Sequence, residues 1–369
     1  MTKKSLNIVH FISSLHRGGA ETILFHVVKD LQKRGWTQRV VYIYDGPIHD
    51  ELRALGIPTY HLTALGLYVN PVLWWRLLNY MRSARPDVMH TALWAANLMG
   101  RCIGWLLHIP TVSSLHAVAA HEGKVRNTID RFLPVRACAT IAVSQGIATS
   151  VLAAGMCQQR TMRVIPNGID VADFKRAAQG AQEMPYVVDG QTWVVGAVGR
   201  LVPVKKFDLL IRVFAKLVQK HSNARLLIIG TGPEEQALRS LIALQSCADF
   251  IELITHKKAA PYYRAFHCFV QPSEFEGLSL ALLEALAMEV PVIVTGKDGS
   301  HEVVTHGVTG LVIPANNEDA FYEALVEMHV NKRQAQNLRT AGYEQVMQSY
   351  SLTSMVDSYE RIFVQRIVS

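Results

Sequence analysis

The chain has 369 residues, half of them hydrophobic, which is too long for one ordinary core and predicts two domains. No low-complexity or repeated segment is present, which excludes a largely disordered chain and a repeat array. The net charge of +7 is uneven, because residues 1–185 carry 20 Lys and Arg against 11 Asp and Glu, whereas residues 186–369 carry 17 against 19. The basic first half favours an anionic partner, although a solvated basic surface explains it equally well.

No segment predicts a signal peptide or a membrane-spanning helix. The most apolar window, residues 91–112, is interrupted by Arg101 and His108 and predicts a buried helix and strand. The five cysteines are scattered without a C-x-x-C pair, which is typical of a reducing compartment. We therefore expect a cytoplasmic protein.

Strand and helix patterns alternate along the chain, which predicts a parallel α/β architecture. In the first half the predicted strands are 6–12, 38–44, 87–91, 111–117, 140–144 and 162–166, and the predicted helices include 20–34, 71–85 and 97–108. Residues 177–191 are small and polar and predict a linker. In the second half the predicted strands are 193–199, 226–230, 250–254, 268–271, 290–295 and 311–313, with helices at 208–221, 233–246 and 352–368. Two such sheets predict two Rossmann-like lobes that bind ligands at the carboxyl ends of their strands.

Paired glycines follow the first predicted strand. Gly18 and Gly19 suit a loop that closes over a ligand, and an ordinary strand–helix turn explains them about as well. The dinucleotide fingerprint G-x-G-x-x-G is missing, since Gly230 and Gly232 are not followed by the third glycine. This disfavours an NAD-binding protein.

Several polar residues follow later strands. His116 ends the strand predicted at 111–117, but with fifteen histidines in the chain it is as readily a structural residue. Asn167 and Asp170 predict a turn followed by a helix cap. Arg200 and Lys205 follow the strand at 193–199 and suit an anionic ligand, although surface cations are the alternative.

The stretch 272–288 is the most informative. Glu276, Gly277 and then Glu284, amid apolar helix-forming residues, predict a tight loop that leads into a buried helix. The first N–H groups of such a helix bind anionic oxygens, whereas carboxylates accept hydrogen bonds from hydroxyl groups. Phosphate flanked by hydroxyls on both sides describes a nucleotide-sugar.

Together these motifs resemble retaining glycosyltransferases of the GT-B fold, glycosyltransferase family 4. Residues 276–284 are similar to the family's E-x7-E signature, 198–211 to its Gly-Arg-Leu…Lys segment, 163–170 to its Pro-Asn-Gly-x-Asp loop, and 16–21 to its first glycine-rich loop. The resemblance implies two Rossmann-like α/β lobes with parallel sheets and the active site in the cleft between them. Residues 1–185 would bind the acceptor, residues 186–351 the nucleotide-sugar, and the helix at 352–369 would pack back on the first lobe.

The resemblance also implies roles for single residues. Arg200 and Lys205 would neutralise the departing diphosphate, Glu276 would contact hydroxyls of the donor sugar, and Glu284 would accept hydrogen bonds from the ribose. Residues with an implied catalytic role are Arg200, Lys205, Glu276 and His116; those with an implied donor-binding role are Glu284, Gly277, Leu278, Ser279, Leu280, Gly18 and Gly19. The sequence departs from the family at Val204 and Lys206, where an acidic residue and a glycine are common, and Glu302 resembles another recurring family glutamate.

We therefore interpret the chain as a hexosyltransferase that retains the anomeric configuration. No metal or other cofactor is expected, since Asp-x-Asp, H-E-x-x-H and cysteine clusters are missing from the sequence. The donor would be a nucleoside-diphosphate sugar and the acceptor a lipid-linked or surface-polysaccharide glycan, as in capsule or lipopolysaccharide biosynthesis; no nucleic-acid partner is expected. A sugar-nucleotide epimerase and a non-catalytic nucleotide-sugar-binding subunit are the alternatives.

A membrane surface is a further expected partner. Residues 74–85 and 124–136 combine aromatic and basic side chains, which suit attachment to the anionic inner face of the cytoplasmic membrane. Trp74 and Trp75 could equally be core residues.

Overall fold

The computed structural model describes residues 6–63, 70–116, 124–132, 139–180, 192–295 and 299–368. The chain forms two compact units, Met1–Asn167 with Leu352–Ser369, and Gly168–Ser351. The sequence predicts this boundary at residue 185. The structure divides the chain earlier because helix α7 (Val171–Ala178), capped by Asp170 as predicted, packs on α10 (Leu280–Ala287) of the second unit. Of the predicted linker, residues 181–191 lie outside the described residues.

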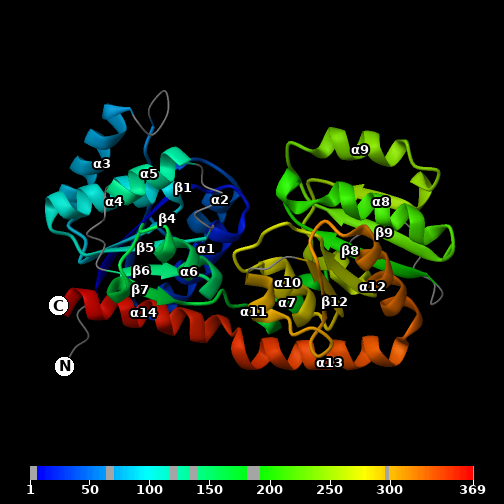
Figure 1. Cartoon of the computed structure of the whole chain (residues 1–369). Helices are drawn as coiled ribbons and strands as arrows, with labels where there is room; N and C mark the ends of the chain where they lie inside the picture. Colours follow the sequence, from blue (N-terminus) through cyan, green and yellow to red (C-terminus); the bar gives the residue numbers. More distant parts are fainter. Residues whose placement is uncertain are drawn as a thin grey trace. The chain divides into compact units, whose positions relative to one another are not determined.

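The first unit is built on a seven-stranded parallel sheet with the order β3-β2-β1-β4-β5-β6-β7 (Figure 1). Its strands are β1 (Asn7–Ser14), β2 (Thr37–Tyr44), β3 (Thr59–His61), β4 (Val88–Ala92), β5 (Thr111–Leu115), β6 (Ala139–Ala142) and β7 (Met162–Val164). The described helices are α1 (Gly19–Lys33), α2 (Pro47–Ala54), α3 (Pro71–Ala84), α4 (Trp94–Leu107), α5 (Lys124–Phe132), α6 (Gln145–Ala153) and α14 (Leu352–Val368).

Strand β1 supplies side chains to two cores, because successive residues of a strand point to opposite faces. Val9 and Phe11 pack with residues of α3 and α4. Ile12 packs instead with residues of α1 and α2. The sheet is therefore covered on both faces, as parallel sheets generally are.

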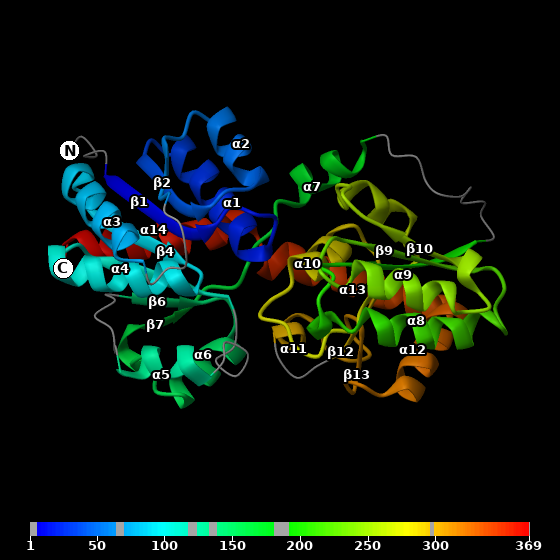
Figure 2. The same cartoon turned by 90° about the horizontal axis from the view of Figure 1, so that it is seen from above.

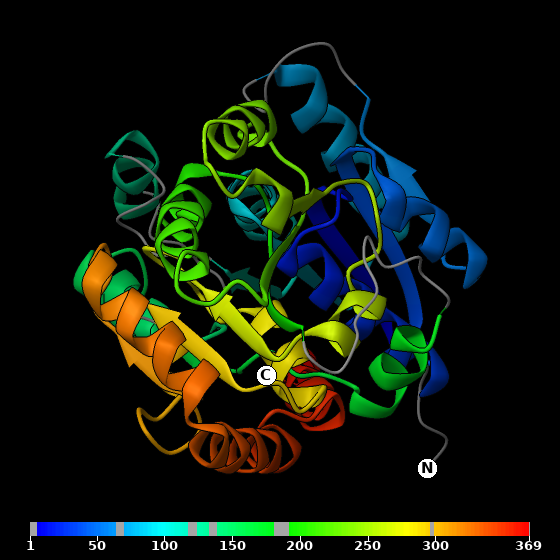
Figure 3. The ribbon, with the colours of Figure 1, turned by 90° about the vertical axis from the view of Figure 1, so that its right-hand side faces the viewer.

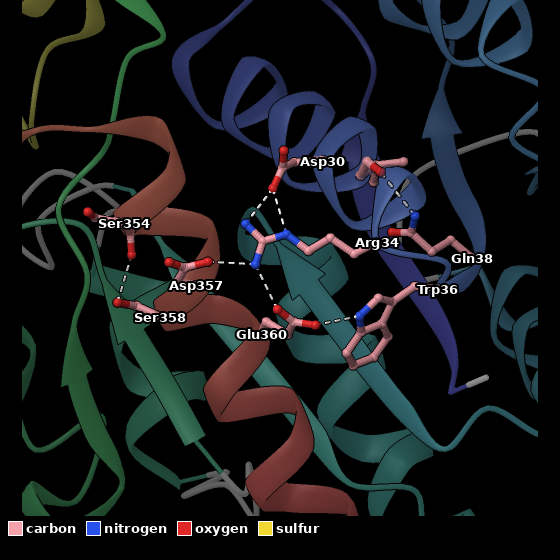
Figure 4. Close-up of polar contacts among 9 residues, drawn as sticks. Asp30, Arg34, Trp36, Gln38, Ser354, Asp357, Ser358 and Glu360 are labelled. Atoms are coloured by element: carbon pink, nitrogen blue, oxygen red, sulfur yellow. Dashed lines mark hydrogen bonds and ion pairs between the residues drawn. The ribbon is translucent and has the colours of Figure 1, made fainter. Parts of the chain in front are cut away.

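Helix α14 is held to the first unit by a cluster of charges around Arg34 (Figure 4). The Arg34 guanidinium donates to Asp357 at 2.6 Å, to Glu360 at 2.7 Å and to Asp30 at 2.8 Å. Trp36 donates its indole N–H to Glu360 at 2.8 Å. The last helix of the chain is thus fastened to the end of α1.

The second unit is built on a six-stranded parallel sheet with the order β10-β9-β8-β11-β12-β13. Its strands are β8 (Trp193–Val198), β9 (Ala224–Ile229), β10 (Ile251–Ile254), β11 (Cys268–Gln271), β12 (Val292–Thr295) and β13 (Leu311–Ile313). The described helices are α7 and α10, given above, with α8 (Phe207–Val218), α9 (Glu235–Ala243), α11 (Gly299–Val303), α12 (Glu318–Val330) and α13 (Lys332–Ser349).

The helices of the second unit divide between the faces of its sheet. Helix α8 lies between α9 and α12 (Figure 2), and Trp193, Val195 and Ala197 of β8 share one core with these three helices. Helix α10 contacts β11 and β12 and packs on α7 and α13, and α13 also lies beside α12 (Figure 3).

The predicted α/β architecture with two parallel sheets is confirmed, and each of the twelve predicted strands overlaps an observed one. The strand that the prediction missed, β3, has only three residues and none of them is buried, so it carries no hydrophobic pattern. Strand β5 was predicted too long: it ends at Leu115, and His116 follows it.

The Arg34 cluster leads to a first prediction. Removing the guanidinium in Arg34→Ala leaves three carboxylates facing one another, which should destabilise α14 by about 1–2 kcal/mol. Amide hydrogen exchange of residues 352–368 should then accelerate about 5- to 30-fold. Arg212→Ala is the matched control, since Arg212 also joins two carboxylates, Asp208 and Glu318, but its side chain is 42% exposed against 23% for Arg34. An equal acceleration around Arg212 would contradict a special role for the cluster.

Candidate functional site

Each sheet reverses its strand order at one place, between β1 and β4 in the first unit and between β8 and β11 in the second. In α/β proteins the loops that follow two such strands leave in opposite directions, and ligands bind beyond the carboxyl ends of these strands. In the second unit the loop after β8 carries Arg200 and Lys205, and the loop after β11 carries Glu276 and its neighbours. The structure therefore brings these predicted site residues to the same edge of one sheet.

Lys205 and Glu276 are in direct contact. The ammonium group of Lys205, at the end of the turn η3 (Pro203–Lys205), hydrogen-bonds Oε1 of Glu276, and Ser273 donates its hydroxyl to the same oxygen at 2.6 Å. Only 20% of the Lys205 side chain and 12% of the Glu276 side chain are exposed. An ion pair this enclosed fixes the positions of both side chains.

A second set of contacts joins the loop after β8 to the loop after β11. The backbone N–H of Glu274 donates to the carbonyl of Val204 at 2.9 Å, and the Lys206 ammonium lies 3.4 Å from the Glu274 carboxylate. Lys206 has φ of +51°, in the left-handed region that favours glycine. Val204 thus contributes its backbone carbonyl to this contact, and Lys206 adopts a conformation that glycine would adopt without strain.

Arg200 follows β8 by two residues and is exposed. Within the described residues its side chain makes no ion pair, which distinguishes it from Lys205. An exposed cation without an ion-pair partner among the described residues, at the carboxyl edge of the sheet, suits an anionic ligand.

Helix α10 begins at this edge. Its cap is Ser279, whose hydroxyl accepts from the N–H of Leu282 at 3.3 Å, and the helix starts at Leu280. Gly277 and Leu278 are buried beneath the start of α11, where the N–H of Gly299 donates to the carbonyl of Glu276 at 3.1 Å. A side chain at residue 299 would place its Cβ 1.5 Å from the Gly277 carbonyl oxygen, so only glycine allows this approach.

Glu284 lies one helical turn into α10 and is only partly exposed. Its carboxylate accepts a 2.8 Å hydrogen bond from the hydroxyl of Tyr263, in the turn η5 (Ala260–Ala265). Burial raises the pKa of Glu284 to about 7, against the opposing effect of the Tyr263 hydrogen bond. A carboxyl group that titrates near neutrality and has a defined partner is typical of a binding site.

Tyr263 was missed by the sequence analysis. It is 1% exposed, stacks against Phe269 of β11, and is the hydrogen-bond donor that orients Glu284. Nothing in the sequence marks it, because it lies 21 residues from Glu284 and carries no motif.

The remaining predicted residues, Gly18, Gly19 and His116, belong to the first unit. Gly18 caps α1 after β1, and a side chain there would meet the Glu21 carboxylate at 2.5 Å, whereas nothing crowds Gly19. His116 is partly buried, and burial lowers its pKa to about 4, so it is neutral at physiological pH. All three lie at carboxyl ends of the first sheet, after β1 and β5.

The residues that the structure describes contain no group of three or more His, Cys, Asp or Glu side chains placed to hold a metal ion. None of their helices is both long and apolar enough to cross a bilayer.

Two protein-family models match the chain. The glycosyltransferase family 4 model matches residues 17–173 and the glycosyl transferases group 1 model matches residues 192–331, so together they cover most of both units. The chain belongs to glycosyltransferase family 4. The resemblance stated from the sequence motifs is confirmed.

Solved structures identify the fold of this family 4 protein as GT-B. HepE from Anabaena, in a crystal structure with UDP-glucose, superposes with a TM-score of 0.84 over 98% of this chain and 100% of HepE, at 19% identity. Such a likeness shows the fold.

Two curated relatives have named activities. The GDP-mannose-dependent alpha-(1-6)-phosphatidylinositol monomannoside mannosyltransferase of Mycobacterium tuberculosis is 30% identical over 199 residues, half of this chain and 51% of the relative. The capsular polysaccharide biosynthesis glycosyltransferase CapM of Staphylococcus aureus is 26% identical over 234 residues, 61% of this chain and 62% of CapM. The chain spans slightly under two thirds of the length of the first curated relatives that it matches.

The buried carboxyl group leads to a second prediction. Since the pKa of Glu284 is raised to about 7 in the folded protein, the folded state holds this proton more tightly than the unfolded state does. The resulting stabilisation is complete below about pH 4.5 and is lost as the pH rises through 7. Glu284→Gln cannot titrate, so its stability relative to the wild type should improve by about 1–3 kcal/mol between pH 5 and pH 8.

The measurement is the unfolding midpoint of each protein at the two pH values. Glu327→Gln, at an exposed position of α12, is the control and should show the same difference from the wild type at both. A Glu284→Gln difference that does not grow with pH would show that this carboxyl group is not held protonated near neutrality.

Proposed function

We propose that the protein is a retaining, metal-independent glycosyltransferase that transfers a hexose from a nucleoside-diphosphate sugar to a hydroxyl of a lipid-linked or surface-polysaccharide glycan. The observation that carries the proposal is the grouping of Arg200, Lys205 and Glu276 with the start of α10 at one sheet edge. Cations and helix N–H groups suit a diphosphate, while Glu276 and Glu284 suit the hydroxyls of the sugar and the ribose. Membership of family 4 supports the same activity.

In the proposed reaction, the bond between the anomeric carbon and the diphosphate oxygen breaks, and its electron pair stays with the diphosphate. Arg200 and Lys205 stabilise the negative charge that develops there. Such electrostatic stabilisation is often the largest single contribution to the rate enhancement of an enzyme. The acceptor hydroxyl attacks from the same face, and its proton passes to the leaving phosphate oxygen. For Lys205 to reach a phosphate it would exchange its bond to Glu276, which frees the Glu276 carboxylate to accept from a sugar hydroxyl.

The class of donor and acceptor is inferred from the relatives. HepE was crystallised with UDP-glucose, and the mycobacterial relative is named for GDP-mannose and a phosphatidylinositol mannoside acceptor. CapM is named for capsular polysaccharide. These names support a nucleoside-diphosphate hexose as donor and a lipid-linked or surface glycan as acceptor.

Four measurements separate this proposal from its alternatives. NMR of the product should show the anomeric configuration of the donor, and EDTA should leave the rate unchanged. An isomerised donor formed without acceptor would indicate an epimerase instead, and donor binding without transfer or hydrolysis would indicate a non-catalytic subunit. An inverted product would exclude the same-face reaction.

The site residues lead to a third prediction. Glu284→Ala should raise the Kd for UDP about 10-fold, because it removes the hydrogen-bond acceptor for the ribose. Lys205→Ala should lower kcat about 100-fold with a smaller effect on UDP binding, because its charge matters most as the diphosphate departs. Calorimetry with UDP and steady-state kinetics distinguish the two effects.

Lys220→Ala and Glu327→Ala are the matched controls. Helices α8 and α12 follow strands, so these residues near the helices' far ends lie toward the amino edge of the sheet. Neither control should change Kd or kcat. Wild-type values for both site variants would remove the site assignment.

A membrane surface is the second partner that we propose. Trp75 of α3 is 63% exposed and Trp105 of α4 is 55% exposed, on two helices that pack together, whereas Trp74 packs into the core. Arg82 and Arg85, at the end of α3, are exposed as well. Exposed tryptophans beside cations suit an anionic bilayer surface.

This surface leads to a fourth prediction. Sedimentation with phosphatidylglycerol vesicles at low salt should recover the wild-type protein, and Trp75→Ala should reduce the bound fraction about fivefold. Leu244→Ala is the control, because Leu244 is an 82% exposed apolar residue of the second unit. A protein that does not bind these vesicles, or a loss of binding equal in both variants, would contradict the proposal.

A further inference from the structure

Tyr350 joins three parts of the second unit that are far apart in sequence. Its N–H donates to the carbonyl of Val346 at 3.0 Å, at the end of α13. Its carbonyl accepts from the N–H of Ile169 at 2.9 Å, where the neighbouring Ser351 forms a bridge with Ile169. Its hydroxyl donates to the carbonyl of Glu302 at 2.7 Å, in α11. Tyr350 is 7% exposed, so these groups are bonded away from water.

Helix α11 is in turn attached to the site loop at its other end. The N–H of Gly299 donates to the carbonyl of Glu276 at 3.1 Å, and Gly299 fits against the Gly277 carbonyl because it has no side chain. Ser300 accepts a 2.7 Å hydrogen bond from Gln271, the last residue of β11. A five-residue helix is too short to hold its own position, so these contacts at both ends must supply it.

The contacts form one continuous path to the Glu276–Ser279 loop. It runs from the Tyr350 hydroxyl to the Glu302 carbonyl, along α11, and from the Gly299 N–H to Glu276. The hydrogen bond from Tyr350 to Glu302 is the step of this path that is farthest in sequence from the loop. It depends on a single atom, the hydroxyl oxygen of Tyr350.

We propose that Tyr350 is a positioning residue, whose hydroxyl holds α11 against the Glu276–Ser279 loop and so sets the geometry of the donor site. Tyr350 acts on the loop through α11. The expected effect of Tyr350 on donor binding rests on the proposed function, whereas the expected effect of Tyr350 on the loop does not. The chain enters this unit at Gly168 and leaves it at Ser351, and the bridge between Ile169 and Ser351 pairs these two segments beside Tyr350.

The test is Tyr350→Phe, which removes one oxygen and keeps the ring. Without nucleotide, amide hydrogen exchange should accelerate at least about threefold in peptides covering 272–280 and 299–304, the size of effect expected when one hydrogen bond is lost. Peptides of α12 should keep the wild-type rate. The Kd for UDP should rise about 3- to 10-fold.

Two variants serve as references. Tyr359→Phe is the matched control, because Tyr359 is also a buried tyrosine, 1% exposed, near the end of the chain, but its hydroxyl lies 3.3 Å from Ser114 of the first unit. It should leave exchange in 272–280 and the Kd for UDP unchanged. Gly299→Ala forces α11 away from the loop, so it should accelerate exchange in the same peptides as Tyr350→Phe.

The outcomes separate this inference from the proposed function. Accelerated exchange confined to residues around 346–351, or spread equally over α12, would overturn the positioning role. If the wild type does not bind UDP but Tyr350→Phe still accelerates exchange in 272–280, the proposed donor is wrong and the positioning role stands.

Discussion

The ion pair between Lys205 and Glu276 is the interaction on which the candidate site depends, and the pairing of β8 with β11 makes it possible. These neighbouring strands run parallel with Val195 opposite Cys268 and Gly196 opposite Phe269, so the loops that follow them leave the sheet at the same edge. Gly196 is required here, since a Cβ at this position would lie 2.3 Å from the Phe266 ring. The register of two buried strands thus determines which cation meets which carboxylate.

The site also contains groups that oppose folding. Lys206 adopts a left-handed conformation as a non-glycine residue, and Glu284 keeps a carboxyl group in surroundings that raise its pKa to about 7. Each feature lowers stability in isolation, and the rest of the unit must offset both. Tyr263 and the ion pairs of the two loops supply part of this compensation. Such costs are typical of residues that are selected for binding a ligand and not for folding.

The sequence predicted the strands well because a buried parallel strand is a short apolar run between turn residues, a signal that survives without tertiary information. It also predicted that Arg200, Lys205 and Glu276 follow strands, and the structure brings them to one sheet edge, while their chemical roles stay a prediction. The boundary between the units was less accessible, because α7 is amphipathic and its sequence does not say which core it packs on. Contacts such as Tyr263 with Glu284, or Tyr350 with Glu302, join residues 21 and 48 positions apart and exist only in the folded chain.

A buried histidine pair in the first unit shows why altered pKa values alone do not identify a site. Burial lowers the pKa of His10 to about 4 and lowers that of His90 well below its usual value. The ring nitrogens of the two residues are 3.0 Å apart, His10 also contacts the Gln38 amide oxygen at 3.0 Å, and His90 contacts the Ser114 hydroxyl at 2.8 Å.

One assignment of protons satisfies this chain of contacts. His10 must donate to the Gln38 oxygen, so its other nitrogen accepts from His90, and the second nitrogen of His90 accepts from Ser114. Each ring is then neutral with both nitrogens bonded, and every group in the row is at most 4% exposed. A saturated network has no hydrogen-bonding capacity left for a ligand, whereas the Glu284 carboxylate accepts from Tyr263 alone among the described side chains, and the residue is only partly buried. A functional titratable group is therefore distinguished from a structural one by unused hydrogen-bonding capacity at a sheet edge. By that criterion Glu284 is a stronger candidate for a functional group than the His10–His90 pair.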